Sequence, residues 1–224
     1  MRKPGICMAS LPDYAELHCL SNFSFLRAAA HPEELVERAA AQGYSALALT
    51  DECSLAGVVR AHLAAKRAGL KLIVGSEMLT VDGLKLVFLA CNRHGYGNLS
   101  ALITLARRRA EKGGYTLQRN DLEAVSPSGA LPDCLVLWVP GENSLSDEGK
   151  WLASRFPGRC WIAVELHAGP DDSERLDRLL ALGEACGLPL VAAGDVHMHV
   201  KARRPVQDVL TALRLKSTVF EAGY

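Results

Sequence analysis

The stretch SALALTDECSLAGVVRAHLAAKRAGLKLIVG, residues 45–75, decides the fold. Its first and last segments, 45–50 and 71–75, are short apolar runs typical of buried strands. Between them an i, i+3, i+4, i+7 spacing predicts a helix that Gly69 can end. The helical face would be formed by Leu55, Val58, Val59 and His62. Strands that alternate with helices in this way predict a mostly parallel sheet.

The same alternation continues on both sides of this stretch. Further strands are predicted at 14–20, 133–139, 160–166 and 188–194, and further helices at 31–44, 98–114, 173–187 and 204–215. Residues 78–92 are predicted to form a hairpin that turns at Asp82-Gly83, and 126–133 a plain loop. Six or seven such units favour an α/β barrel over an open sheet, and barrels of about 200–250 residues form single domains. We therefore expect one barrel domain over residues 1–224, with functional residues at the C-terminal ends of its strands.

The composition limits the classes of function. Lys+Arg and Asp+Glu both number 25, so no overall basic field indicates nucleic-acid binding. The 7 cysteines are scattered, with no CxxC pair, and several lie in apolar runs, so they are interpreted as reduced, mostly buried thiols of a cytoplasmic protein. The N-terminal segment has no long apolar region, and no apolar run approaches ~18 residues, so neither a signal peptide nor a membrane span is predicted.

Polar residues collect at the predicted strand ends. They are His18, Asp51, Glu52, Glu77, Glu165, His167, Asp195 and His197. Closing a barrel would bring several of them together, which is compatible with a divalent-metal or phosphoester site. Two structural alternatives remain open. Asp51 could be a helix N-cap, and His18 could be a hydrogen-bonded core residue.

The stretch ELHCLSNFSF, residues 16–25, raises a further question about such a site. Alternate residues of a strand point to the same side, so a second ligand would be expected two residues after His18. Residue 20 is Leu, which cannot ligate a metal.

Four segments carry a resemblance to a known family. They are ELHCLSNFSFL, ALTDECSLAGVVRAHLAAKRAGLKLIVGSE, CNRHGYGNLSALITLARRRAEKG and VAAGDVHMHVKARRPVQDVLTALR. Together they resemble the N-terminal PHP (polymerase and histidinol phosphatase) domain of bacterial C-family DNA polymerases, closest to the error-prone, damage-inducible branch. The resemblance implies a distorted (βα)7 TIM-like barrel. It also implies that the chain is an N-terminal fragment and that the polymerase core would follow it.

Active members of this superfamily hold divalent metals with His, Asp and Glu side chains. By the resemblance, His18 matches the first His of the His-x-His motif, and Glu77 matches the bridging Glu. Asp195 and His197 match the closing Asp-x-His.

Other ligand positions are replaced. Leu20 stands where the second His is expected, Arg27 where an acid or His is usual, and Glu52 in the place of the His of Thr-Asp-His. Lys85 falls where a His precedes the next strand, and a ligand is lost around 140–141. A cationic side chain repels a metal rather than binding it. We therefore expect a vestigial pocket with no catalytic residue, no bound metal and no cofactor in this domain.

We further expect the cations at 27 and 85 to stand in for metals. The guanidinium of Arg27 should then lie within hydrogen-bond reach of Glu77, Asp195 or Glu52. The alternative is that Arg27 points to solvent.

The resulting hypothesis is a catalytically silent domain with a structural role in an error-prone, translesion DNA polymerase. The alternative is a metal-dependent phosphoesterase or 3′–5′ exonuclease with a reduced metal count, in which His18, Glu52, Glu77, Asp195 and His197 hold one metal. A free-standing histidinol-phosphate-phosphatase-like enzyme is a weaker alternative. Expected partners are the polymerase core of the same chain and, through the full-length protein, DNA, the sliding clamp and other subunits of the mutagenesis complex.

Overall fold

The computed structural model describes residues 13–124 and 129–222. The segment considered for a signal peptide and the first part of the loop predicted at 126–133 lie outside these ranges. Within these ranges, seven strands form one sheet in chain order. They are β1 (Ala15–Glu16), β2 (Ala46–Leu49), β3 (Lys71–Leu79), β4 (Lys85–Ala90), β5 (Cys134–Trp138), β6 (Cys160–Glu165) and β7 (Leu190–Ala193).

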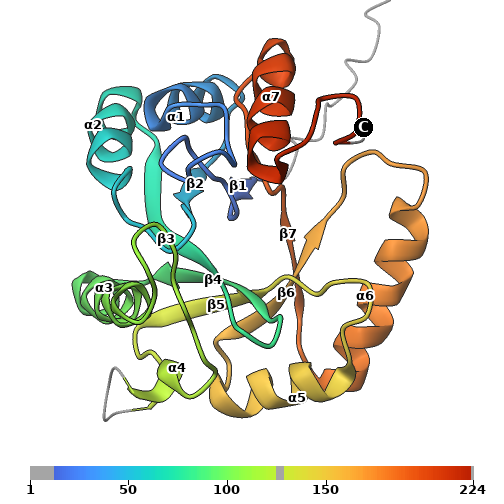
Figure 1. The fold of residues 1–224 in the computed structure, drawn as a ribbon. Coiled ribbons are helices and arrows are strands. Elements are labelled where there is room, and N and C mark those ends of the chain that lie inside the picture. The colour runs from blue at the N-terminus through green and yellow to red at the C-terminus, as the bar shows by residue number, and fades with distance from the viewer. Residues whose placement is uncertain (1–12, 125–128, 223–224) are drawn as a thin grey trace, which may run out of the picture.

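The sheet curves into a nearly closed barrel (Figure 1). Strands β1, β2 and β3 are parallel, β4 is antiparallel to both of its neighbours, and β5, β6 and β7 are parallel. An isolated parallel bridge between Cys19 and Val196 brings the two edges of the sheet together. The predicted distorted TIM-like barrel is therefore confirmed.

Strand β3 accounts for the distortion. The apolar run at 71–75 and the first arm of the predicted hairpin are one strand of nine residues. The hairpin turns through Gly83 at φ +93°, a conformation that glycine adopts without strain. Because a tight turn and not a helix follows β3, β4 is antiparallel to it.

Helices surround the barrel (Figure 1). They are α1 (Pro32–Ala41), α2 (Val58–Ala68), α3 (Arg93–Arg108), α4 (Asp121–Ala124), α5 (Ser146–Arg155), α6 (Asp172–Cys186) and α7 (Arg204–Leu215), with a 3₁₀ turn η1 (Lys201–Arg203) before α7. The helices predicted at 31–44, 98–114 and 173–187 are present with shifted ends, the helix predicted at 204–215 has the predicted bounds, and α4 and α5 are additions.

The buried side of α2 differs from the prediction. Of the predicted face, Val59 is 69% exposed and His62 is also exposed, whereas Leu55 and Val58 are partly buried. Half of that face therefore lies toward solvent. Ala61, Ala64 and Ala65 are buried instead, in one cluster with residues of α1 and β2. Alanine side chains allow two helices to approach closely, and the close packing of α1 selects this face.

Strand β1 is shorter than the predicted 14–20. The carboxylate of Glu16 accepts hydrogen bonds from the amides of His18 and Gly194, at 2.9 and 2.8 Å. A side chain thus satisfies backbone groups that a longer strand ladder would pair. The loop that begins at His18 is thereby fixed beside the end of β7.

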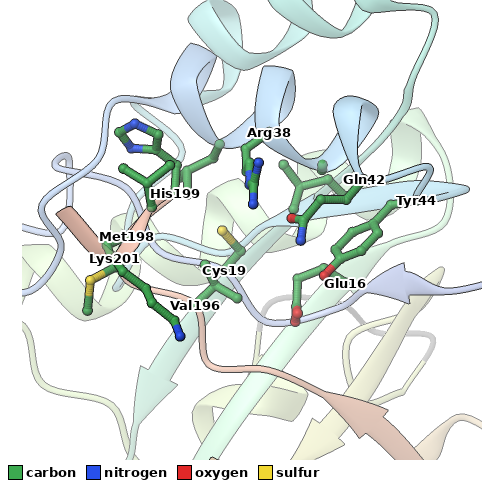
Figure 2. A pocket seen from close by; sticks show the side chains of 13 residues that line it. Glu16, Cys19, Arg38, Gln42, Tyr44, Val196, Met198, His199 and Lys201 are labelled. Atoms are coloured by element: carbon green, nitrogen blue, oxygen red, sulfur yellow. The ribbon is translucent and has the colours of Figure 1, made fainter. Parts of the chain in front are cut away.

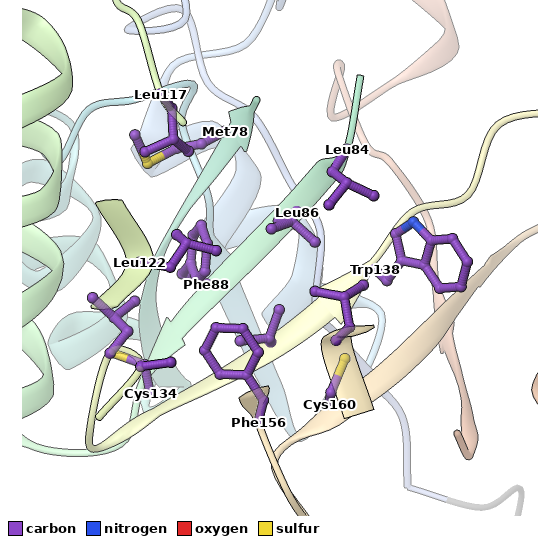
Figure 3. Close-up of a cluster of buried hydrophobic side chains, with 14 of the residues drawn as sticks. Met78, Leu84, Leu86, Phe88, Leu117, Leu122, Cys134, Trp138, Phe156 and Cys160 are labelled. Atoms are coloured by element: carbon purple, nitrogen blue, oxygen red, sulfur yellow. The ribbon is translucent and has the colours of Figure 1, made fainter. Parts of the chain in front are cut away.

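The described residues form three clusters of buried apolar side chains. One fills the barrel interior with residues that include Ala48, Val87, Leu137 and Ala163. A second joins α1 and α2 to β2. The largest lies between the outer face of β3–β6 and helices α3–α6 and contains Phe88, Trp138 and Phe156 (Figure 3).

The thiols are mostly buried, as predicted. Among the described cysteines, Cys91 is an exception and is exposed, because β4 ends at Ala90 and Asn92 already caps α3. Within the described residues, no helix is long and apolar enough to cross a membrane.

Candidate functional site

His18 lies at the centre of a buried polar cluster at one end of the barrel. It is fully buried, and each ring nitrogen contacts a carboxylate: Nδ1 lies 2.6 Å from Glu165 and Nε2 lies 2.8 Å from Glu77. A carboxylate accepts hydrogen bonds, so both nitrogens must donate, and the ring is an imidazolium. Burial lowers the pKa of His18, but the hydrogen bonds to Glu165 and Glu77 outweigh it and raise the pKa to about 9.

Arg27 enters the cluster from the loop that follows His18. Its guanidinium donates to Glu52 at 2.8 Å and also to Glu77. The predicted contact is therefore present, and the alternative that Arg27 points to solvent is wrong. Gln207 of α7 holds the loop from outside, because its Nε2 donates to the carbonyl of Arg27 at 2.6 Å.

Lys85, the first residue of β4, also reaches the acidic side chains. Its Nζ lies 3.0 Å from Glu77 and 3.7 Å from Asp195. The antiparallel hairpin positions this amine, because β4 begins at the end of the barrel where β3 finishes. The cation expected at position 85 is thus part of the same cluster.

Within the cluster, Glu77 and Asp195 are the two acids that contact the most other side chains. Glu77 faces three cations, His18, Arg27 and Lys85. Desolvation by burial raises the pKa of Glu77, but the hydrogen bond to His18 and the nearby positive charges hold it well below its usual range. Burial acts in the same way on the pKa of Asp195, and the contacts with His197, His18 and Lys85 again keep it low. Both acids are therefore ionised at neutral pH.

The structure also adds residues to the cluster that sequence reasoning left out. Glu165 ends β6 and was recognised as a strand-end acid, but it was not included in the predicted pocket. Tyr115 donates its hydroxyl to Glu52 at 3.1 Å, and no local pattern in the sequence signals that contact. With Glu165 included, three cations face four carboxylates.

Three other predicted positions lie apart from these ion pairs. Asp51 is not the N-cap of α2, whose N-cap is Gly57; it accepts hydrogen bonds from Ser21 and Ser24. His167 is exposed. Leu20 is fully buried, and its amide donates to Val196.

Among the described residues, one group has the spacing of a metal site. Ligand atoms of His18, Glu165 and Asp195 all lie within 4.8 Å of one another. As arranged, Nδ1 of His18 carries a proton toward Glu165, and the Lys85 amine lies beside Asp195. A cation would fit here only after His18 lost that proton and Lys85 moved away. The donor set in this structure therefore does not fit a bound metal.

A cavity of about 440 Å³ opens over this cluster. Its wall comes from the cluster and from α7 and includes Arg27, Glu52, Glu77, Leu79, Lys85, His197, Gln207, Thr211 and Arg214. Figure 2 shows a different pocket, of about 340 Å³, between α1 and the segment 196–201. None of the eight residues of the predicted vestigial pocket lines the pocket of Figure 2. The ion-pair cluster is therefore reached through the cavity of about 440 Å³.

Comparison with known proteins places the chain in a family. The family model described as "PHP domain" matches residues 16–130. The chain is 86% identical over 96% of its length to an error-prone DNA polymerase of Dechloromonas aromatica, and 56% identical over 95% to one of an Azoarcus species. It spans 21% and 22% of those relatives, about a fifth of their length.

A solved structure shares the fold. The lesion-specific endonuclease of Pyrococcus furiosus superposes with a TM-score of 0.54 at 14% identity. The match covers 83% of this chain and 48% of that one. At this identity the similarity concerns the fold alone.

Proposed function

The chain belongs to the PHP domain family, and from this premise we propose that it is a non-catalytic, bracing domain of an error-prone DNA polymerase. In this proposal, side-chain cations hold the positions that metal ions hold in catalytic relatives. The domain contributes rigidity to the longer chain and performs no hydrolysis of its own. We propose a vestigial pocket of His18, Arg27, Glu52, Glu77, Lys85, Asp195 and His197, with Glu165 added and with Leu20 in the place of a lost ligand.

The observation that carries the proposal is the engagement of both ring nitrogens of His18 by carboxylates. A histidine that ligates a metal must offer a lone pair, and an imidazolium has none. Arg27 and Lys85 then supply fixed positive charge to Glu52, Glu77 and Asp195. Metal-assisted hydrolysis needs an activated water on an open metal position, and this arrangement supplies neither.

The activity of the whole protein is proposed from its relatives. We infer that the full-length protein is a nucleotidyltransferase, which copies damaged DNA in translesion synthesis as part of the cytoplasmic response to DNA damage. The polymerase core of the same chain is its nearest partner. DNA, the sliding clamp and other mutagenesis-complex subunits are partners of the full-length protein.

One observation favours a second candidate function. The spacing of His18, Glu165 and Asp195 would allow one divalent cation if the imidazolium were deprotonated. The domain would then be a phosphoesterase or 3′–5′ exonuclease with a reduced metal count. Glu52 and Glu77 were also expected as metal ligands in this alternative, but both accept hydrogen bonds from Arg27.

An activity assay separates the two functions. The purified protein is supplied with Mn²⁺ and assayed with p-nitrophenyl phosphate and with a 3′-labelled DNA strand. We expect no turnover above background. The matched pair of variants is His18→Ala in the cluster and His167→Ala at the surface. Turnover that is abolished by His18→Ala and retained by His167→Ala would establish the hydrolytic function instead.

A further inference from the structure

Helix α7 is held by the domain over very little of its surface. Of its 12 residues only Ala212 is buried. Helix α1 has 10 residues, of which four are buried. Figure 1 shows α7 standing beside α1, after β7, on the outside of the barrel. A helix with so little buried surface gains little stability from packing.

The polar side of α7 faces the protein. Gln207 and Thr211 are one turn apart on the helix and line the cavity over the ion-pair cluster together with Arg214. Gln207 also donates to the carbonyl of Arg27. This side of α7 is thus used by the site already described.

The apolar side of α7 faces solvent. Val206, Val209 and Leu213 recur at i, i+3 and i+7, so they form one stripe, and they are 44%, 49% and 59% exposed. A surface helix normally turns its apolar stripe inward and its polar side to water. Helix α7 does the reverse. Helix α2 also exposes Val59 and Leu63, and α6 exposes Leu180, but each of these two helices buries three residues where α7 buries one.

We infer that the stripe formed by Val206, Val209 and Leu213 is the surface on which the remainder of the longer chain docks. Relatives that match 94% or more of this chain are about five times its length, so most of the protein that could cover the stripe is covalently attached. A tethered segment has a high effective concentration, which favours it over a second copy. Docking there would press Gln207 and Thr211 against the cluster and join the site to the polymerase core.

This inference rests on the proposed bracing function and names the surface that performs it. The test uses the full-length polymerase with a photo-crosslinking amino acid at position 213, and at position 180 as the matched control. Leu180 is 48% exposed, on α6, whose side chains Leu179 and Cys186 are buried. We expect illumination to give crosslinked peptides that join position 213 to residues beyond 224 of the same chain, and no such peptides from position 180.

Three results would overturn the inference: crosslinks between two chains, crosslinks from position 213 only to residues of 1–224, or no crosslink.

A second measurement compares Leu213→Asp with Leu180→Asp in the full-length protein. The Leu213 variant should lose more soluble yield and melt at a lower temperature, and equal losses would contradict the docking. Metal found in the protein alongside an intrachain crosslink would refute the metal-free site and leave the docking surface standing. Absence of both metal and crosslink would support the metal-free site and refute the docking surface.

Discussion

Arg27 connects two glutamates from different segments, Glu52 after β2 and Glu77 within β3. Its guanidinium is always charged and can bond two carboxylates at once, which a metal ion would otherwise do. Without it, Glu77 would still contact His18 and Lys85, but Glu52 would lose its one cationic partner among the described ion pairs. The residue therefore contributes to the stability of the fold through charge balance.

Replacing Arg27 with Ala should lower the free energy of unfolding by about 2–4 kcal/mol at neutral pH, as expected when a partly buried ion pair loses one partner. Adding Glu77→Gln should recover part of that loss, because it removes one of the orphaned charges. Chemical denaturation of wild type, both single variants and the double variant measures the coupling. The matched control is Arg60→Ala, which removes a half-exposed surface pair with Glu33 and should cost about 1 kcal/mol or less. An Arg27→Ala protein as stable as wild type would contradict this account.

His18 should make the stability of the protein depend on pH. Its pKa is raised to about 9 by the facing carboxylates of Glu165, Glu77 and Asp195, from an ordinary value of about 6.5. Its contribution is therefore fully present below about pH 6.5 and is lost as the pH rises through about 9. The shift corresponds to on the order of 3 kcal/mol. Glu77 and Asp195 have lowered pKa values, so their contribution is lost at the acidic end instead.

The measurement is the difference in unfolding free energy between wild type and His18→Gln from about pH 6 to about pH 10. This range includes both the ordinary pKa of histidine and the raised pKa of His18. We expect this difference to shrink as the pH rises through about 9. The surface variant His167→Gln should show no such trend. A difference that stays constant over the whole range would mean that His18 is neutral in the folded protein.

At the scale of elements, helix α3 contains two glycines whose surroundings differ. A Cβ at Gly95 would lie 2.0 Å from the carbonyl oxygen of Asp133, whereas nothing lies within 4 Å of a Cβ at Gly97. The close approach of α3 to the start of β5 therefore requires glycine at 95. No such requirement exists at 97.

Gly95→Ala should accordingly destabilise the protein by about 1–3 kcal/mol, as overpacking does. Gly97→Ala should stabilise it by up to about 1 kcal/mol, because alanine has the higher helix propensity. Thermal unfolding of the two variants beside wild type provides the comparison. The same sign of shift for both variants would show that helix propensity, and not the contact with Asp133, decides the outcome.

The elements show where sequence patterns are informative and where they are not. Apolar runs located all seven strands, because burial on both sides requires them. The same periodicity placed Val59 and His62 on the buried face of α2, where the structure buries Ala61, Ala64 and Ala65 instead, because α1 packs closely against the alanine side chains. The helix predicted at 204–215 is present as α7, but the outward orientation of its apolar stripe depends on the polar site beneath it.

At the scale of the whole molecule, barrel closure explains how much of the site could be predicted. Residues at successive strand ends converge when the sheet closes, so His18, Glu77 and Asp195 were expected to meet. The contact of Arg27 followed from the need to neutralise their charge. Which carboxylates would hold the two ring nitrogens of His18 could not be predicted, because that depends on the stagger of β6 relative to β3. Glu165 was missed as a pocket residue for this reason.

The central claim is that side-chain cations, and not metal ions, neutralise the carboxylates of this site. The measurement that tests it most directly is elemental analysis of the purified protein after dialysis against zinc, manganese and iron. The account predicts metal contents far below one ion per chain, because protonated His18, Arg27 and Lys85 already occupy the acids. A stoichiometric ratio of one metal ion or more per chain, lost in a His18→Ala variant, would contradict it.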